Sequence, residues 1–232
     1  MSPIYILIAL SMSLSCTTSE KKSEGVGYRL GDMIKSKSMR AGDGGRQFHL
    51  DHYPDSIASE YMRRTDEESN IEILESIVSE RSVRPEQVPD SNTLILHLRI
   101  GDVIDQTPHM VKEFLARYVL YSNGVNYVKP LSYYEAVHKK MTAADPNISK
   151  VVILGGYHKV LKRKAKSQKY VDRIQQFFES KNMSVTLRIN MDADEDFIFM
   201  SNSSYFTPSG GGFSELVKKI VQKRGKTIIA PE

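Results

Sequence analysis

Apolar residues follow two alternating patterns in the second half of the chain. Short strand-like segments, most of them apolar runs and one, 185–189, with alternating apolar residues, lie between longer segments in which apolar residues return every three or four positions, as in amphipathic helices. The predicted strands are 94–98, 151–154, 185–189, 205–207 and 227–230. The predicted helices lie at 111–118, from 132, around 171–178, at 194–200 and from 214 to 224. This alternation predicts an α/β fold: a Rossmann-like parallel sheet with helices on both faces.

Two of these helices carry signals for their first residues. Ser132, followed three residues later by Glu135, predicts a capping box. Ser214 is predicted to be the N-cap of the last helix, which Gly225 ends. We therefore expect polar side chains to fix both starts.

The first half of the chain is less regular. Residues 3–16 are apolar and Ser-rich and are followed by a polar, charged segment. The apolar stretch is shorter than the roughly 20 residues of a membrane-spanning helix, so we interpret residues 1–16 as a signal peptide or short anchor. An N-terminal strand is the alternative. Farther along, residues 70–79 carry apolar positions at helical spacing, and Pro85 and Pro89 mark a boundary before a unit that spans 91–232.

Composition narrows the class of protein. The chain has 232 residues, 40% hydrophobic and 26% charged, which suits one large or two small domains with a real core. The net charge of +4 is too small to indicate nucleic-acid binding. Sequons at Asn147, Asn182 and Asn202 permit a secretory route. Together with the N-terminal segment, they predict a location in the ER or Golgi, in the lumen or at the membrane, or secretion.

The first chemical motif begins in the last two residues of the predicted strand 94–98 and continues past its carboxyl end. It reads His97-Leu98-Arg99-Ile100-Gly101-Asp102. In open α/β sheets, ligands bind outside the carboxyl ends of the strands. A cation there is costly to desolvate unless an anion faces it, and Arg favours bidentate recognition of phosphate or carboxylate. The alternative is a structural His beside an Arg99–Asp102 ion pair.

The second motif opens the last helix. It comprises Ser209, Gly210, Gly211, Gly212, Phe213 and Ser214. Glycines let a backbone approach a ligand closely, and a helix N-terminus offers unpaired N–H groups and the positive end of a dipole. After a strand and before a helix, this pattern predicts a phosphate cradle. A flexible turn with an ordinary cap is the alternative.

These motifs together resemble those of a known superfamily. Residues 97–102 are similar to the His-x-Arg-Arg-Gly-Asp motif of the inverting fucosyltransferases, which include the α1,2-, α1,6- and protein O-fucosyltransferases. Residues 130–136 resemble that superfamily's Pro-x-x-Tyr-Tyr helix start, and residues 196–201 and 205–214 resemble its C-terminal block. The resemblance implies a GT-B-like architecture in which 91–232 form the nucleotide-sugar donor domain. Residues 25–90 would form a shortened N-terminal domain on the acceptor side.

The resemblance also implies an activity. It predicts inverting transfer of fucose from GDP-fucose to a glycan or protein acceptor, with no metal cofactor and with possible N-terminal membrane association. Arg99 would be catalytic, because it neutralises the β-phosphate of departing GDP. His97 would hold the nucleotide or its loop, and Asp196 would accept hydrogen bonds from the guanine edge. The expected donor-binding set also contains Asp102, Ser209, Gly210, Gly211, Gly212, Phe213 and Ser214.

Departures from the family pattern leave alternatives open. Ile100 replaces the second Arg, and 155–158 read Gly-Gly-Tyr-His where the families often have acidic residues. Candidates for a catalytic base are Asp102, Asp105 and His158. A catalytically silent protein that binds a nucleotide sugar or glycan is the alternative function.

Two further patterns could hold a metal ion. Asp192-Ala193-Asp194 could be the Asp-x-Asp metal site of another glycosyltransferase class. His49-Leu50-Asp51-His52 could supply metal ligands, although the sequence contains no third ligand cluster to complete the site.

Overall fold

The structure is a computed structural model that describes residues 71–79 except 73 and 77, then 85–121, 126–157, 165–191 and 193–231. The segment interpreted as a signal peptide or anchor, most of 25–90 and the pattern His49–His52 lie outside the described residues. So do His158 and the side chains of Asp192 and Asp194.

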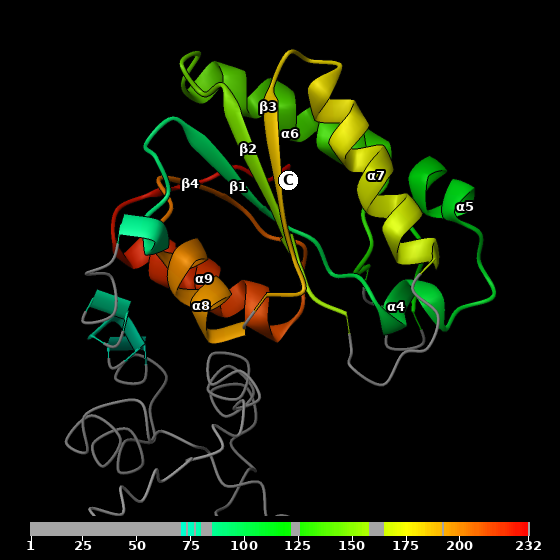
Figure 1. The fold of residues 1–232 in the computed structure, drawn as a ribbon, viewed down its shortest axis with the longest axis horizontal. Helices are drawn as coiled ribbons and strands as arrows, with labels where there is room; N and C mark the ends of the chain where they lie inside the picture. Colours follow the sequence, from blue (N-terminus) through cyan, green and yellow to red (C-terminus); the bar gives the residue numbers. More distant parts are fainter. Residues whose placement is uncertain are drawn as a thin grey trace, which may run out of the picture.

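A five-stranded parallel sheet forms the centre of the fold (Figure 1). Its strands are β1 (Thr93–His97), β2 (Lys150–Gly155), β3 (Ser184–Ile189), β4 (Tyr205–Thr207) and β5 (Thr227–Ile228). They are ordered β3-β2-β1-β4-β5, and every neighbouring pair is parallel. All five residues of the central strand β1 are buried, which explains its continuous apolar sequence. The predicted α/β, Rossmann-like fold is confirmed.

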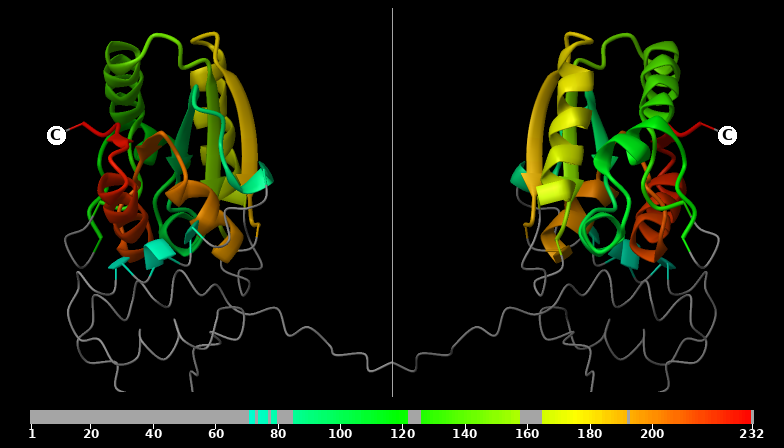
Figure 2. Two further views of the ribbon diagram at one scale, coloured as in Figure 1. Left: turned by 90° about the vertical axis from the view of Figure 1, so that its left-hand side faces the viewer. Right: turned by 90° about the vertical axis from the view of Figure 1, so that its right-hand side faces the viewer.

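Helices cover both faces of this sheet (Figures 1 and 2). They are α4 (Asp102–Asp105), α5 (Val111–Ala116), α6 (Leu131–Ala144), α7 (Ala165–Glu179), α8 (Ala193–Ser201) and α9 (Gly212–Lys223), with a 3₁₀ helix, η1 (Pro85–Gln87). Leu94 and Leu96 belong to the hydrophobic cluster that includes α6 and α7, whereas Ile95 belongs to the cluster that includes α8 and α9. Alternate residues of one strand therefore enter two cores, as the period of two requires.

The predicted amphipathic helix at 70–79 is confirmed for its described residues. Ile71, Leu74 and Val78 are buried in the same cluster as α8 and α9. Arg224, just after α9, donates from Nη2 to Ser79 Oγ at 2.7 Å, and its Nε lies 3.7 Å from Glu75 Oε1. This helix is therefore joined to the sheet by apolar packing and by charge.

The predicted capping box at Ser132 and Glu135 is wrong. α6 begins one residue earlier, at Leu131, and its N-cap is Pro130, with no side-chain cap bond. Tertiary contacts fix this start, because Tyr133 and Tyr134 are buried and Tyr133 Oη donates to Pro208 O at 3.0 Å. Packing against the loop after β4 therefore overrides the local signal.

The three sequons lie at one end of the sheet. Asn147 precedes β2, Asn182 precedes β3 and Asn202 precedes β4. Because the strands are parallel, all three lie at the amino ends of strands, opposite the edge where carboxyl ends gather. Asn147 and Asn182 are exposed, whereas the Asn202 amide donates to Gln87 O and Ile198 O at 3.2 and 3.0 Å.

The C-terminal segment runs beside α6, where Lys140 Nζ donates to Ala230 O at 2.9 Å (Figure 2). Among the described residues, no helix has the length and apolar character needed to cross a bilayer.

Candidate functional site

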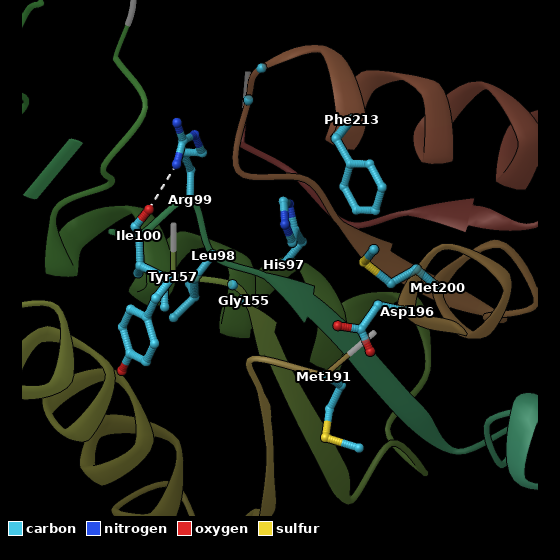
Figure 3. A pocket seen from close by; sticks show the side chains of 13 residues that line it. His97, Leu98, Arg99, Ile100, Gly155, Tyr157, Met191, Asp196, Met200 and Phe213 are labelled. Atoms are coloured by element: carbon cyan, nitrogen blue, oxygen red, sulfur yellow. Dashed lines mark hydrogen bonds between the residues drawn. The ribbon is translucent and has the colours of Figure 1, made fainter. Parts of the chain in front are cut away.

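The strand order creates a crevice at the carboxyl ends of the strands. From β1 the chain continues to β2 on one side, and it later crosses over to β4 on the other side of β1. Such a switch point is where ligands bind in open α/β sheets. A pocket of about 250 Å³ lies there (Figure 3). It is lined by His97, Leu98, Arg99, Ile100, Gly155, Gly156, Tyr157, Met191, Asp196, Met200, Gly210, Gly211 and Phe213.

His97 lies at the centre of this pocket. It is the last residue of β1 and pairs in register with Leu154 of β2. The residue is 8% exposed, its Nδ1 lies 3.0 Å from Ser209 Oγ, and its ring centroid lies 5.6 Å from that of Phe213. Burial, and then the charge of Arg99, lower the pKa of His97 to about 4. The side chain is therefore neutral at physiological pH.

Arg99 is held at one side of the pocket by its own turn. Its Nη1 donates to Ile100 O at 2.8 Å and lies 2.7 Å from Asp102 Oδ1 (Figure 3). Gly101 has φ 86°, a conformation that suits glycine, and its N–H donates to Ser167 Oγ at 2.9 Å. Asp102 is not among the pocket-lining residues, so its carboxylate serves to orient Arg99.

The residue that follows Arg99 in the pocket lining is apolar. Ile100 is fully buried. A Cβ atom at Gly155 would lie 3.0 Å from Ile100 Cδ1 and 3.0 Å from Leu98 O. Glycine therefore allows the ends of β1 and β2 to approach each other, and Ile100 fills the space that remains. Among the described residues that line the pocket, Arg99 is the one cation.

Asp196 lies on α8, across His97 from Arg99 (Figure 3). The Asp196 side chain is 10% exposed, and its Oδ1 lies 2.5 Å from Nε of Arg188 on β3. The Arg188 guanidinium also lies 4.7 Å from the centroid of Phe199. Arg188 was not among the predicted site residues. The signal was present, because Arg188, like Arg99, is an Arg at the carboxyl end of a predicted strand.

The loop of residues 209–211, called the glycine loop below, leads the chain into α9. Gly210 and Gly211 have φ of 100° and 81°, and Gly211 is the N-cap. The predicted N-cap role of Ser214 is therefore wrong: the helix begins at Gly212, and Ser214 lies in its first turn. Ser214 is fully buried, and its Oγ accepts a hydrogen bond from Ser209 N at 3.0 Å.

The predicted donor-binding set is only partly gathered. His97, Arg99, Asp196, Gly210, Gly211 and Phe213 line the pocket. Asp102, Ser209 and Ser214 do not, and Gly212 is the first residue of α9. Ser209 and Ser214 instead join the loop to His97 and to α9.

Asp105, a candidate base, is engaged elsewhere. Its Oδ1 accepts from the backbone N–H groups of Lys166 and Ser167 at 3.1 and 3.2 Å, and its Oδ2 accepts from the Ser167 hydroxyl. These contacts satisfy the start of α7. Asp105 therefore has a structural role and lies outside the pocket lining.

The chain was compared with known proteins in two ways. A scan against protein-family models gives no match for the chain, and a search of curated proteins gives none either.

The pocket itself combines a cation and a positive-φ glycine turn with a carboxylate, between apolar walls that include Met191, Met200 and Phe213. It can accept a ligand with an anionic group and a separate hydrogen-bond donor edge.

Proposed function

We propose that this chain is an inverting glycosyltransferase that uses GDP-fucose, with a glycan or protein as acceptor. One observation carries the proposal: three separate segments, the end of β1 with His97 and Arg99, α8 with Asp196, and the glycine loop, converge on one pocket at the switch point. These residues follow one another along the chain in the same order as the fucosyltransferase motifs that they resemble, which supports the same assignment. Diphosphate would lie near Arg99 and Gly210–Gly211, and guanine near Asp196.

The reaction assigns each group a role. An acceptor hydroxyl attacks the anomeric carbon of fucose, the bond from that carbon to the β-phosphate oxygen breaks, and GDP leaves with the electron pair. The hydroxyl proton passes to a base or to solvent. Arg99 stabilises the charge that develops on the β-phosphate, in a site where fixed donors replace water. The pocket is slightly smaller than the roughly 300–1,000 Å³ usual for ligand sites, so the sugar would extend beyond it.

A second candidate function rests on Ile100. A buried apolar side chain at this position leaves the diphosphate with less positive potential than the family's Arg pair would supply. This observation favours a silent protein that binds a nucleotide sugar or glycan. The two functions share the nucleotide site, so only transfer separates them.

Thermal unfolding with GDP, GDP-fucose, GDP-mannose, UDP and UDP-GlcNAc tests the nucleotide assignment. A ligand at 100 times its Kd adds about 2.7 kcal/mol of stability. We expect guanine nucleotides to stabilise the protein more than uridine nucleotides at equal concentration. Equal affinity for GDP and UDP would contradict the proposal that Asp196 selects guanine.

The variant Asp196→Asn should weaken GDP binding by about 1–3 kcal/mol, because it exchanges an ionic acceptor for an amide. Asp172→Asn is the matched control, since Asp172 is a half-buried carboxylate on α7, outside the pocket lining, that accepts from Gln168. The same loss of affinity in both variants would show that the effect is not local to the pocket.

Transfer in excess chelator tests the absence of a metal cofactor. We expect activity to persist, because Arg99 and the glycine loop would provide the positive potential that a metal ion otherwise supplies. If chelator abolishes activity and manganese or magnesium restores it, the diphosphate site would instead be a metal site at Asp192 and Asp194.

A further inference from the structure

A hydrogen-bond relay joins β1 to α9 across the switch point. His97 Nδ1 lies 3.0 Å from Ser209 Oγ, and Ser209 N donates to Ser214 Oγ at 3.0 Å. The three residues are 8%, 2% and 0% exposed, so water has little access to these bonds. The relay therefore fixes one ring nitrogen of a side chain that lines the pocket.

Which partner donates in the bond between His97 Nδ1 and Ser209 Oγ can be decided by finding an acceptor for each hydrogen. A neutral imidazole donates from one nitrogen and accepts at the other. If Nδ1–H donated to Ser209, the serine hydroxyl hydrogen would need another acceptor. Within the described part of the chain, Ser209 Oγ makes no other hydrogen bond. A buried donor without an acceptor bears its full desolvation cost.

The opposite arrangement satisfies both groups. If the Ser209 hydroxyl donates to Nδ1, the imidazole proton resides on Nε2. We propose that Ser209 is a positioning residue that fixes His97 as the Nε2–H tautomer, so that His97 presents an N–H donor to a ligand oxygen. The recipient oxygen would lie between His97 and Arg99, where two donors meet. This last assignment rests on the proposed function, whereas the tautomer does not.

Charged groups around His97 are compatible with this assignment. Arg99 follows it on the same strand end, Asp196 lies across the pocket on α8, and the Phe213 ring from α9 packs beside the imidazole. Burial together with Arg99 holds the pKa of His97 at about 4, so a single neutral tautomer can persist at pH 7.

Nitrogen-15 NMR of the full chain with labelled histidine rings tests the tautomer directly. The His97 signals are assigned from their loss in His97→Gln. In the wild-type protein we expect ring shifts of the Nε2–H form at pH 7. In Ser209→Ala we expect a mixture of tautomers, and in Ser209→Thr a return to the Nε2–H form. Ser203→Ala is the matched control, because it removes another fully buried serine hydroxyl, which donates to Met200 O.

Two NMR results would overturn the proposal. One is an Nδ1–H pattern in the wild-type protein, and the other is an unchanged Nε2–H pattern in Ser209→Ala. If Ser209→Ala fails to fold in a thermal unfolding control, the wild-type and Ser209→Thr spectra still decide the tautomer.

Calorimetric titration with GDP tests the functional consequence. We expect Ser209→Ala to bind GDP at least tenfold more weakly than wild type, with affinity recovered in Ser209→Thr and unchanged in Ser203→Ala. Wild-type affinity in Ser209→Ala would overturn the role in binding. If the wild-type protein shows the Nε2–H tautomer but binds no nucleotide, the proposed function fails and the positioning role of Ser209 stands.

Discussion

At the scale of single residues, the burial of His97 has a consequence for stability. Burial holds its pKa at about 4 in the folded chain, against an ordinary value of 6.5 in the unfolded chain. Between about pH 6.5 and 4 the unfolded chain therefore binds a proton that the native chain does not. The free energy of unfolding should therefore fall as the pH falls from about 6.5 to 4, by up to about 3 kcal/mol.

The control for this prediction is His97→Gln, which keeps a neutral polar side chain. Urea unfolding of both proteins from pH 7.5 to 4 isolates His97, because the other histidines contribute equally to the two curves. Parallel curves would mean that His97 is not held neutral in the native state.

Arg99 permits a second prediction at this scale. Its Nη1 makes both described contacts, with Ile100 O and Asp102, so the proposed diphosphate contact falls to Nη2 and Nε. Arg99→Lys keeps the charge but cannot form this fork, so we expect turnover to fall at least 100-fold, or about 3 kcal/mol. Arg99→Ala should abolish transfer while the protein stays folded and binds GDP weakly.

The control for Arg99 is Arg173→Lys on α7, where the exposed guanidinium donates to Gln176. This variant should turn over normally. Near-normal transfer by Arg99→Ala would exclude Arg99 from the donor site.

At the scale of elements, the contact between the ends of β1 and β2 can be tested with two adjacent glycines. Gly155→Ala would place a Cβ 3.0 Å from Ile100 Cδ1 and from Leu98 O, whereas a Cβ at Gly156 would meet nothing within 4 Å. We expect Gly155→Ala to lose about 1–3 kcal/mol of stability and Gly156→Ala to change it by less than about 0.5 kcal/mol. Denaturant midpoints measure both, and equal losses would contradict the close approach.

The same elements show what a sequence can predict. The central strand was predictable because the apolar run Leu94–Leu98 reflects burial on two faces, and every residue of β1 is buried. The edge strand β3 has no fully buried residue and was predictable from its alternation of apolar and polar residues. Helix starts were not, because Ser132 and Ser214 carry cap-like side chains while Pro130 and Gly211 form the caps. Cap choice depends on where the preceding loop must go, and the sequence around the cap does not contain that information.

At the scale of the whole molecule, Arg224 joins the helix at 71–79 to the end of α8. It donates to Asn202 Oδ1 at 2.5 Å and to Ser79 Oγ at 2.7 Å. Arg224→Ala should lower the free energy of unfolding by about 1–3 kcal/mol and speed amide exchange in residues 71–79. Lys226→Ala, at a nearby exposed position, is the control. Unchanged exchange in residues 71–79 would mean that the contacts of Arg224 do not hold this helix.

The candidate site was predictable in position but incomplete in membership. His97, Arg99 and the glycine turn all follow strands, and parallel strands bring such positions to one edge. Arg188 was missed because its partner, Asp196, is separated from it by a turn whose path the sequence does not specify. Ser209 and Ser214 were taken for ligand contacts, whereas burial directs them to each other. Sequence motifs identify chemical groups, and only packing decides which way they face.

The placement of the sequons has a practical consequence for handling the protein on a surface. Asn147 is exposed at the amino end of β2, at the opposite edge of the sheet from the pocket. Cys16 is the only cysteine of the chain, so Cys16→Ser combined with Asn147→Cys creates a single thiol for attachment. Molecules tethered through this thiol would all present the switch-point crevice to the solution, so each one could be titrated with nucleotide from the same side.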